Sequence, residues 1–168
     1  MRRFATLLSL AAIAGLLAAG PVAARQPGPT IVGTAIAVNQ ATGEFDELIA
    51  AVSRAGLVGT LDGNRQFTVF APTDAAFEEL YAALGVSGVD DIPVATLRAV
   101  LLHHVVPGER FSGDVLDATR IRTLNRDFLT PSVAAGAAYI DGARIVIADV
   151  TASNGVIHVI DHVLVPGP

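Results

Sequence analysis

The apolar positions in the first half of the chain recur at the spacing of amphipathic helices. Phe45, Leu48, Ile49 and Val52 fall at i, i+3, i+4 and i+7, which places four apolar side chains on one helical face. Three further helices are predicted by a threonine or proline followed by an apolar stripe. They begin after Thr30, after Thr73 and at Pro93, with stripes formed by Ile31, Val32, Ala35 and Ile36; by Phe77, Leu80, Tyr81 and Leu84; and by Val94, Leu97, Leu101 and His104.

The second half of the chain changes to short runs of β-branched residues, which favour strands. A first short strand, FTVF, already precedes them at Phe67–Phe70. The segment Tyr139–Ile147 has the pattern of a hairpin around Asp141 and Gly142, and Ser153–Gly155 has that of a turn. The predicted organisation is therefore helical first and strand-rich later.

One late run raises the question of a metal site. ASNGVIHVIDHVLVP, from Ala152 to Pro166, carries His158 and His162 four positions apart. On a helix this spacing would place both imidazoles on one face, as in metal-binding HxxxH arrangements. The β-branched residues favour a strand, where the two side chains lie about 13 Å apart and cannot share one zinc ion. We therefore expect no metal, a buried and hydrogen-bonded His158, and a solvated His162 beside Asp161.

The N-terminus has the order of features found in secretory signals. Arg2 and Arg3 precede an apolar run over residues 4–19, and small residues follow up to Ala24. This order predicts a signal peptide over residues 1–24 that is removed after Ala24. A retained membrane anchor fits less well, because the apolar run is short for a bilayer span.

Charge and composition limit what the remaining chain can do. Without Arg2 and Arg3, nine arginines face sixteen aspartates and glutamates, a net charge of −7 with no lysine. Nucleic acid is not expected as a partner, because phosphate binding needs a basic face. The absence of cysteine excludes disulfides, thiolate metal sites and a cysteine nucleophile. After a Pro/Gly leader at residues 25–29, one domain over residues 30–166 is expected to be a soluble monomer without a membrane span.

Catalytic motifs were considered as well. The sequence has no G-x-S-x-G elbow, no phosphate-binding glycine loop and no HExxH. Ser153, His158 and Asp161 supply the residue types of a triad, but closeness in sequence does not create triad geometry. Two acidic pairs on or beside helices are interpreted as solvated charge: Glu78 with Glu79, and Asp90 with Asp91. Neither enzymatic activity nor a cofactor is expected.

Three blocks of the sequence, taken together, resemble a known family. They are FTVFAPTDAAF from Phe67 to Phe77, LLHHVVPG from Leu101 to Gly108, and ADVTASNGVIHVIDHVLVP from Ala148 to Pro166. Their order and spacing are similar to those of a fasciclin-type adhesion domain, and the similarity runs from about Thr30 to Pro166. The resemblance implies an α+β fold in which a seven-stranded, wedge-like β-sandwich is flanked by several helices.

The same resemblance implies a class of function. Fasciclin-type domains occur in secreted and surface proteins, where they serve adhesion and protein interaction, and the family is not generally enzymatic. A lone domain behind a signal peptide is similar to the bacterial secreted form, which is periplasmic or extracellular. The expected partner is a protein or a cell-surface component.

Two elements that the family uses in cell adhesion are half matched here. A Tyr-His pair falls on His103 and His104, with histidine in place of the tyrosine. An Asp-Ile pair falls on Asp149 and Val150, with valine in place of the isoleucine. These four are the candidate adhesion residues. His104 also lies on the stripe with Leu97, so we expect it in the core, whereas His103 is one helical step of about 100° away and is expected outside the stripe.

Other motif residues are interpreted as determinants of the fold. Thr73 and Asp74 begin a helix, and Asn154 and Gly155 form the turn that precedes His158. Side-chain oxygens at such positions accept hydrogen bonds from backbone N–H groups that otherwise lack a partner.

An alternative function is the binding of a lipid or another small apolar ligand outside the cytoplasm. It is motivated by the overall composition, of which 52% is hydrophobic. A large enclosed apolar pocket would favour this alternative, whereas a solid core with an exposed apolar patch would favour an interaction domain.

The exported protein is predicted to begin near Arg25, because cleavage after Ala24 removes the whole apolar run. N-terminal sequencing of the exported material checks this prediction. Recovery of a chain that starts at Met1 and remains in the membrane fraction would contradict it.

Overall fold

The computed structural model of the chain describes residues 28–167. The predicted signal peptide lies outside the described residues. The helices, together with one short 3-10 turn, are α1 (Ile31–Thr42), α2 (Asp46–Arg54), α3 (Val58–Leu61), α4 (Asp74–Leu84), η1 (Val89–Asp91), α5 (Val94–His103) and α6 (Ser112–Asp117). Within residues 28–167, no helix has both the length and the apolar character needed to cross a bilayer.

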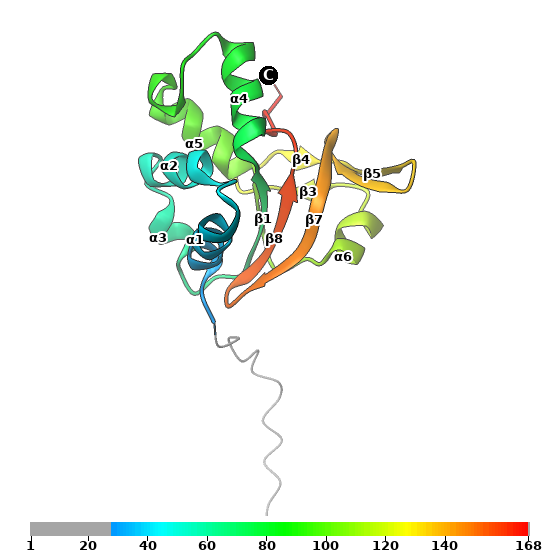
Figure 1. Cartoon of the computed structure of the whole chain (residues 1–168). Coiled ribbons are helices and arrows are strands. Elements are labelled where there is room, and N and C mark those ends of the chain that lie inside the picture. Colours follow the sequence, from blue (N-terminus) through cyan, green and yellow to red (C-terminus); the bar gives the residue numbers. More distant parts are fainter. Residues whose placement is uncertain (1–27, 168) are drawn as a thin grey trace, which may run out of the picture.

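The strands form a six-stranded sheet and a separate two-stranded sheet. They are β1 (Phe67–Pro72), β2 (Val105–Pro107), β3 (Ile121–Arg122), β4 (Phe128–Leu129), β5 (Pro131–Ala134), β6 (Ala137–Ile140), β7 (Ala143–Ala152) and β8 (Gly155–Ile160). The large sheet has the order β2-β1-β8-β7-β6-β5, and β3 pairs with β4. Figure 1 shows α1, α2 and α3 on one side of β1 and β8, with α6 beyond β7 on the other. The fold is thus the predicted α+β wedge, with eight strands in the described residues where seven were expected.

The helices and turns that the sequence predicts are confirmed. α1, α2, α4 and α5 carry the four predicted apolar stripes, except that Phe45 directly precedes α2 and His104 directly follows α5, and β6 and β7 form the predicted hairpin. Asp141 and Gly142 connect these two strands with positive φ angles of 51° and 89°, as the tight turn requires.

β1 and β8 form the parallel centre of the sheet and carry core residues on both faces. Every residue of both strands is buried. Successive residues of a strand point to opposite faces. Val69 therefore packs in a cluster with Leu48 of α2 and Leu101 of α5, while Phe70 packs in a second cluster with Ile140 of β6. Burial on both faces explains why FTVF reads as a continuous apolar run rather than an alternating one.

Thr73 and Asp74 connect β1 to two helices. Thr73 Oγ1 accepts a hydrogen bond of 3.4 Å from the Ala76 N–H in the first turn of α4. The Asp74 carboxylate accepts hydrogen bonds from the N–H groups of Asp46 (3.2 Å) and Glu47 (2.9 Å), the first two residues of α2. One dipeptide thus satisfies free N–H groups at the start of both helices.

Asn154, in the turn between β7 and β8, joins three parts of the backbone. Its Oδ1 accepts a hydrogen bond of 2.7 Å from the Ile31 N–H at the start of α1. Its Nδ2 donates to the carbonyl groups of Leu61 (2.7 Å), the last residue of α3, and of Gly63 (3.0 Å), which follows that helix. The side chain is 2% exposed, so water does not compete for these groups.

Gly155 stands where β8 begins beside β1, and only glycine fits there. A Cβ atom at this position would lie 1.8 Å from the carbonyl oxygen of Phe67, and the φ angle is +153°. The close approach of the two strands therefore depends on the absence of a side chain.

His104 follows α5 and ties the C-terminal segment to it. Leu164 N–H donates a hydrogen bond of 2.8 Å to Nε2, so the proton is on Nδ1, which donates to the Val100 carbonyl at 2.8 Å. The residue is 2% exposed, which confirms its predicted core position. Burial lowers the pKa of His104 to about 4, although the hydrogen bond to Val100 acts in the opposite direction.

Asn154→Ala is predicted to lower the free energy of unfolding by about 3 kcal/mol. It leaves the Ile31 N–H and the Leu61 and Gly63 carbonyls without partners, and each such buried group costs about 1 to 3 kcal/mol. Urea melts check this value, with Gln40→Ala on the exposed side of α1 as the control. Equal midpoints for the two variants would contradict the role of Asn154.

Acidification is predicted to remove the contribution of His104 to stability. The folded-state pKa lies below the ordinary value of 6.5, so the unfolded chain binds the extra proton. The contribution is therefore complete above pH 6.5, is lost as the pH falls toward 4, and amounts to about 3 kcal/mol at most. Urea melts of the wild type and His104→Leu check this, because their difference in unfolding free energy should narrow on acidification.

The control for this experiment is His162→Leu. The His162 side chain is 58% exposed, and its hydrogen bond to Asp161 raises its pKa, so any contribution is small and has the opposite dependence on pH. A difference between wild type and His104→Leu that widens on acidification would show that His104 is charged in the folded protein.

Candidate interaction site

His103, the first residue of the histidine pair, is buried, and the expectation that it lies outside the buried stripe is wrong. Its side chain is 1% exposed. The physical reason is that His103 ends α5, where its side chain lies between residues of the two hairpin turns β3–β4 and β6–β7. These turns cover a position that the periodicity of the stripe alone would leave exposed.

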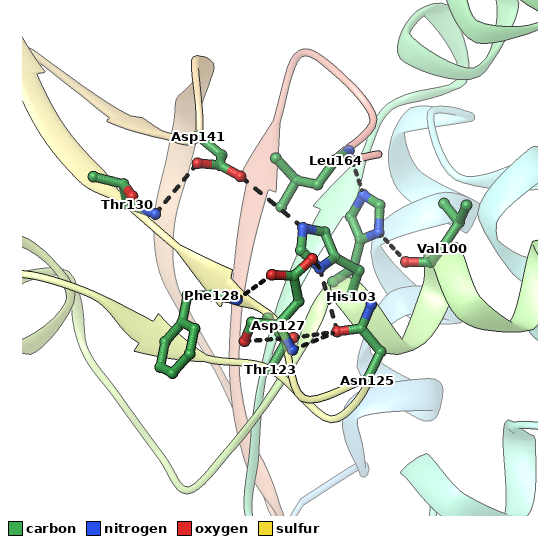
Figure 2. A network of polar contacts seen from close by, with 10 residues as sticks. Val100, His103, Thr123, Asn125, Asp127, Phe128, Thr130, Asp141 and Leu164 are labelled. Atoms are coloured by element: carbon green, nitrogen blue, oxygen red, sulfur yellow. Dashed lines mark hydrogen bonds and ion pairs between the residues drawn. The ribbon is translucent and has the colours of Figure 1, made fainter. Parts of the chain in front are cut away.

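The partners of His103 come from these two turns (Figure 2). Its Nδ1 lies 3.3 Å from Asn125 Oδ1 and 3.8 Å from Asp127 Oδ2, both in the β3–β4 turn. Its Nε2 has no hydrogen-bond partner and lies 4.0 Å from Asp141 Oδ2 in the β6–β7 turn. The two adjacent histidines are therefore held inside the domain, and neither presents its ring to a partner on the surface.

Asp149, the acidic half of the second candidate pair, stands in an irregular part of β7. The register between β7 and β8 shifts between Ile147 and Val150, which marks a β-bulge. Asp149 has a φ angle of +62°, a left-handed conformation that aspartate tolerates better than most residues. The bulge turns the Asp149 side chain toward α6, while Val150 pairs with Ile157 and packs against the core.

The Asp149 carboxylate holds the start of α6. Its two oxygens accept hydrogen bonds from the N–H (2.7 Å) and the hydroxyl (2.6 Å) of Ser112. Partial burial acts to raise the pKa of Asp149, but the bonds from Ser112 outweigh it, so the pKa stays below its ordinary value. The side chain is still 38% exposed, so a fixed negative charge is accessible at the surface.

His158 fixes the same bulge from inside the sheet. Asp149 N–H donates a hydrogen bond of 3.2 Å to Nδ1, so Nε2 carries the proton and donates to the Arg110 carbonyl at 3.0 Å. The ring is fully buried and stacks on Phe70 with a centroid distance of 5.5 Å. Burial lowers the pKa of His158, against the opposing effects of the Arg110 carbonyl and the Asp149 carboxylate.

The other expectations for this run are met in part. β8 confirms the predicted strand, but it ends at Ile160, so the expectation that the strand includes His162 is wrong. Asp161 ends the strand, because its carboxylate accepts hydrogen bonds from the Arg144 N–H and pairs with His162. The structure does not assemble a triad from Ser153, His158 and Asp161, since both nitrogens of His158 are bonded to backbone groups.

The part of β7 next to Asp149 forms an exposed apolar edge. β6 pairs with β7 only at Ala143 and Arg144, so within residues 28–167 the strand ladder beyond Arg144 is one-sided, with β8 as the partner. Val146 and Ile147 are 47% and 51% exposed there. We call Val146, Ile147, Ala148 and Asp149 the β7 edge.

The residues that support this edge are not among the predicted site residues. Arg110 and Ser112 belong to a segment that was assigned no element, although Ser112 and Asp114 at the start of a short run have the signature of a helix N-terminus. The Asp114 carboxylate indeed accepts a hydrogen bond of 3.2 Å from the Phe111 N–H. The exposure of Val146 and Ile147 had no such signal, because they read as ordinary strand residues.

Comparison with known proteins connects this arrangement to a family. The family model of the fasciclin domain matches residues 43–166. Protein sll1483 of Synechocystis is 41% identical over 122 residues, which cover 73% of this chain and 67% of that protein. The transforming growth factor-beta-induced protein ig-h3 of Sus scrofa is 33% identical over 135 residues, which cover 80% of this chain and 20% of that protein.

A solved structure has the same fold. It is a FAS1 domain pair from the insect cell adhesion molecule Fasciclin I, with a TM-score of 0.66 and 18% identity. The similarity covers 82% of this chain and 51% of that chain. With the sequence match over most of its length and the shared α+β wedge, the chain belongs to the fasciclin domain family.

Proposed function

We propose that this protein is an exported interaction domain that binds a protein partner at the cell surface through the β7 edge. The observation that carries the proposal is the run of four exposed residues at this edge, two of them large and apolar. Apolar side chains that gather at the surface next to a polar group are typical of contact sites.

The bulge defines how a partner can approach the β7 edge. An unpaired strand edge exposes backbone N–H and C=O groups, and a bulge limits uncontrolled pairing with other strands. Val146 and Ile147 then supply apolar contact area, and the fixed carboxylate of Asp149 orients the partner by accepting a hydrogen bond from it. Because both Asp149 oxygens are held by Ser112, binding costs little further ordering of this side chain.

The two histidines have a different role in this proposal. His103 and His104 are 1% and 2% exposed, so we assign them to the stability of the fold. Of the four candidate adhesion residues, Asp149 is the one that a partner touches, and Val150 supports it from the core side. Thr73, Asp74, Asn154, Gly155 and His158 are assigned to the fold for the contacts described above.

Location outside the cytoplasm is part of the proposal. It is supported by the N-terminal order of charge, apolar run and small residues over 1–24. It agrees with the occurrence of the same fold in an insect cell adhesion molecule. The net negative charge and the absence of a recognised catalytic motif favour a protein-binding role over nucleic-acid binding or catalysis.

A photo-crosslinking amino acid at position 147 is predicted to capture one discrete partner in intact cells. The reason is that Ile147 lies in the middle of the β7 edge and is 51% exposed. The matched control is position 84, where Leu84 is 55% exposed at the end of α4 and outside the edge. The adduct is detected as a band of increased mass in the envelope fraction.

The companion measurement uses the purified protein and the captured partner. Ile147→Asp should weaken binding at least tenfold, as expected for an apolar contact near the centre of an interface, and leave the urea midpoint unchanged. Equal adduct formation at positions 147 and 84, or no loss of affinity in Ile147→Asp, would refute the β7 edge as the contact site.

A further inference from the structure

An apolar pocket lies between the first helices and the sheet, and no residue of the β7 edge lines it. It is bounded by α1, α2 and α3, and its floor is formed by β1 and β8, which stand beside these helices in Figure 1. Its volume is about 150 Å³. Val32 and Ile49 form walls, and Val69 and Ile157 belong to the floor.

The pocket exists because small residues stand where the helix meets the sheet. Ala35 of α1 and Ala71 of β1 both line it, and neither side chain reaches into the space. The same two alanines also line a smaller space of about 30 Å³ on the other side of α1. A larger side chain at position 35 would therefore fill the pocket, although nothing in the helix itself requires an alanine there.

The chemistry of the lining determines what can enter. Thirteen residues line the pocket, and Ser53 is the one with a polar side chain. A ligand group that needs hydrogen bonds would lose them here, since burying an unpaired polar group is costly. Water is disfavoured for the same reason, because a buried water needs two to four polar partners. The occupant must therefore be a hydrocarbon.

We infer that this pocket binds the hydrocarbon end of a small amphiphile, with the polar end at the mouth. An engineered cavity of about 150 Å³ with a similar lining stays dry and binds benzene, which sets the capacity at about six carbon atoms. At the mouth, Ile36 and Val58 are 39% and 36% exposed, and Ser53 is also exposed and offers a hydroxyl group. This pocket would hold the small apolar ligand of the alternative function that the composition suggested. It is formed by other residues than the β7 edge, which is the proposed partner contact.

The test is a titration of the purified protein with straight-chain alkan-1-ols of four to eight carbons, followed by NMR of the methyl groups of Val69 and Ile157. Affinity should rise about fourfold for each added methylene, because each buried CH₂ contributes a constant amount. The rise should stop at about six carbons, where the pocket is full. A micelle-like or surface effect would continue to rise to eight.

Matched variants locate the binding. Ala35→Phe fills the pocket and should abolish the methyl shifts, whereas Ala37→Phe makes the same change at an exposed position of α1 and should leave them intact. Ile49→Ala enlarges the pocket from the half-buried wall and should extend the rise in affinity by one to two carbons. If Ala35→Phe fails to fold, Ile49→Ala decides whether the alcohols bind in the pocket.

The outcomes separate this inference from the proposed function. No shift at Val69 and Ile157 with any alcohol, equal loss in both phenylalanine variants, or an unchanged chain-length limit in Ile49→Ala would overturn the pocket. Ile147 lines the neighbouring space of about 30 Å³ but not the pocket itself, and the partner is captured without any alcohol, so either proposal can fail while the other stands.

Discussion

The buried amide of Asn154 is the constraint on which the arrangement of the other elements depends. Its three hydrogen bonds connect the start of α1, the end of α3 with the residues that follow it, and the turn between the last two strands. The neighbouring Gly155 lets β8 approach β1 so closely that no other residue is possible. α1, α3, β1 and β8 all line the apolar pocket, so Asn154 and Gly155 connect the elements between which it lies.

Three buried polar side chains, those of Asn154, His104 and His158, form their hydrogen bonds with backbone groups. His104 joins two backbone groups from distant segments, and His158 does the same for Arg110 and Asp149. Burial lowers the pKa of both histidines and so favours their neutral form, although the bonds to the Val100 and Arg110 carbonyls act in the opposite direction. Neither side chain therefore has a free ring nitrogen for chemistry. The accessible fixed charge lies at Asp149, whose carboxylate is brought to the surface by the bulge.

Much of the fold could be predicted from the sequence because its signals are local. Apolar stripes with threonine starts define α1 and α4, and the Asp141–Gly142 turn defines the last hairpin. The failures arise where a tertiary contact decides. His103 is enclosed by two turns that come later in the chain, and no periodicity within α5 contains that information. β8 stops at Ile160 because Asp161 bonds to Arg144, against the β-branched preference of the residues that follow. The motif predicted Asp149 as a site residue. Its hydrogen bonds with Ser112 depend on the β-bulge, which no sequence pattern predicts.

The parallel pairing of β1 with β8 has a consequence for the order of folding. β1 lies near the start of the domain and β8 at its end, so the centre of the sheet cannot close until nearly the whole chain is present. Contacts between such distant segments carry a large entropic cost of loop closure, and folds that depend on them form slowly. The export proposed above would benefit from this order, because passage through a secretion channel requires a chain that has not yet folded. Pairing of the last strand, β8, with β1 is thus the step that completes the sheet.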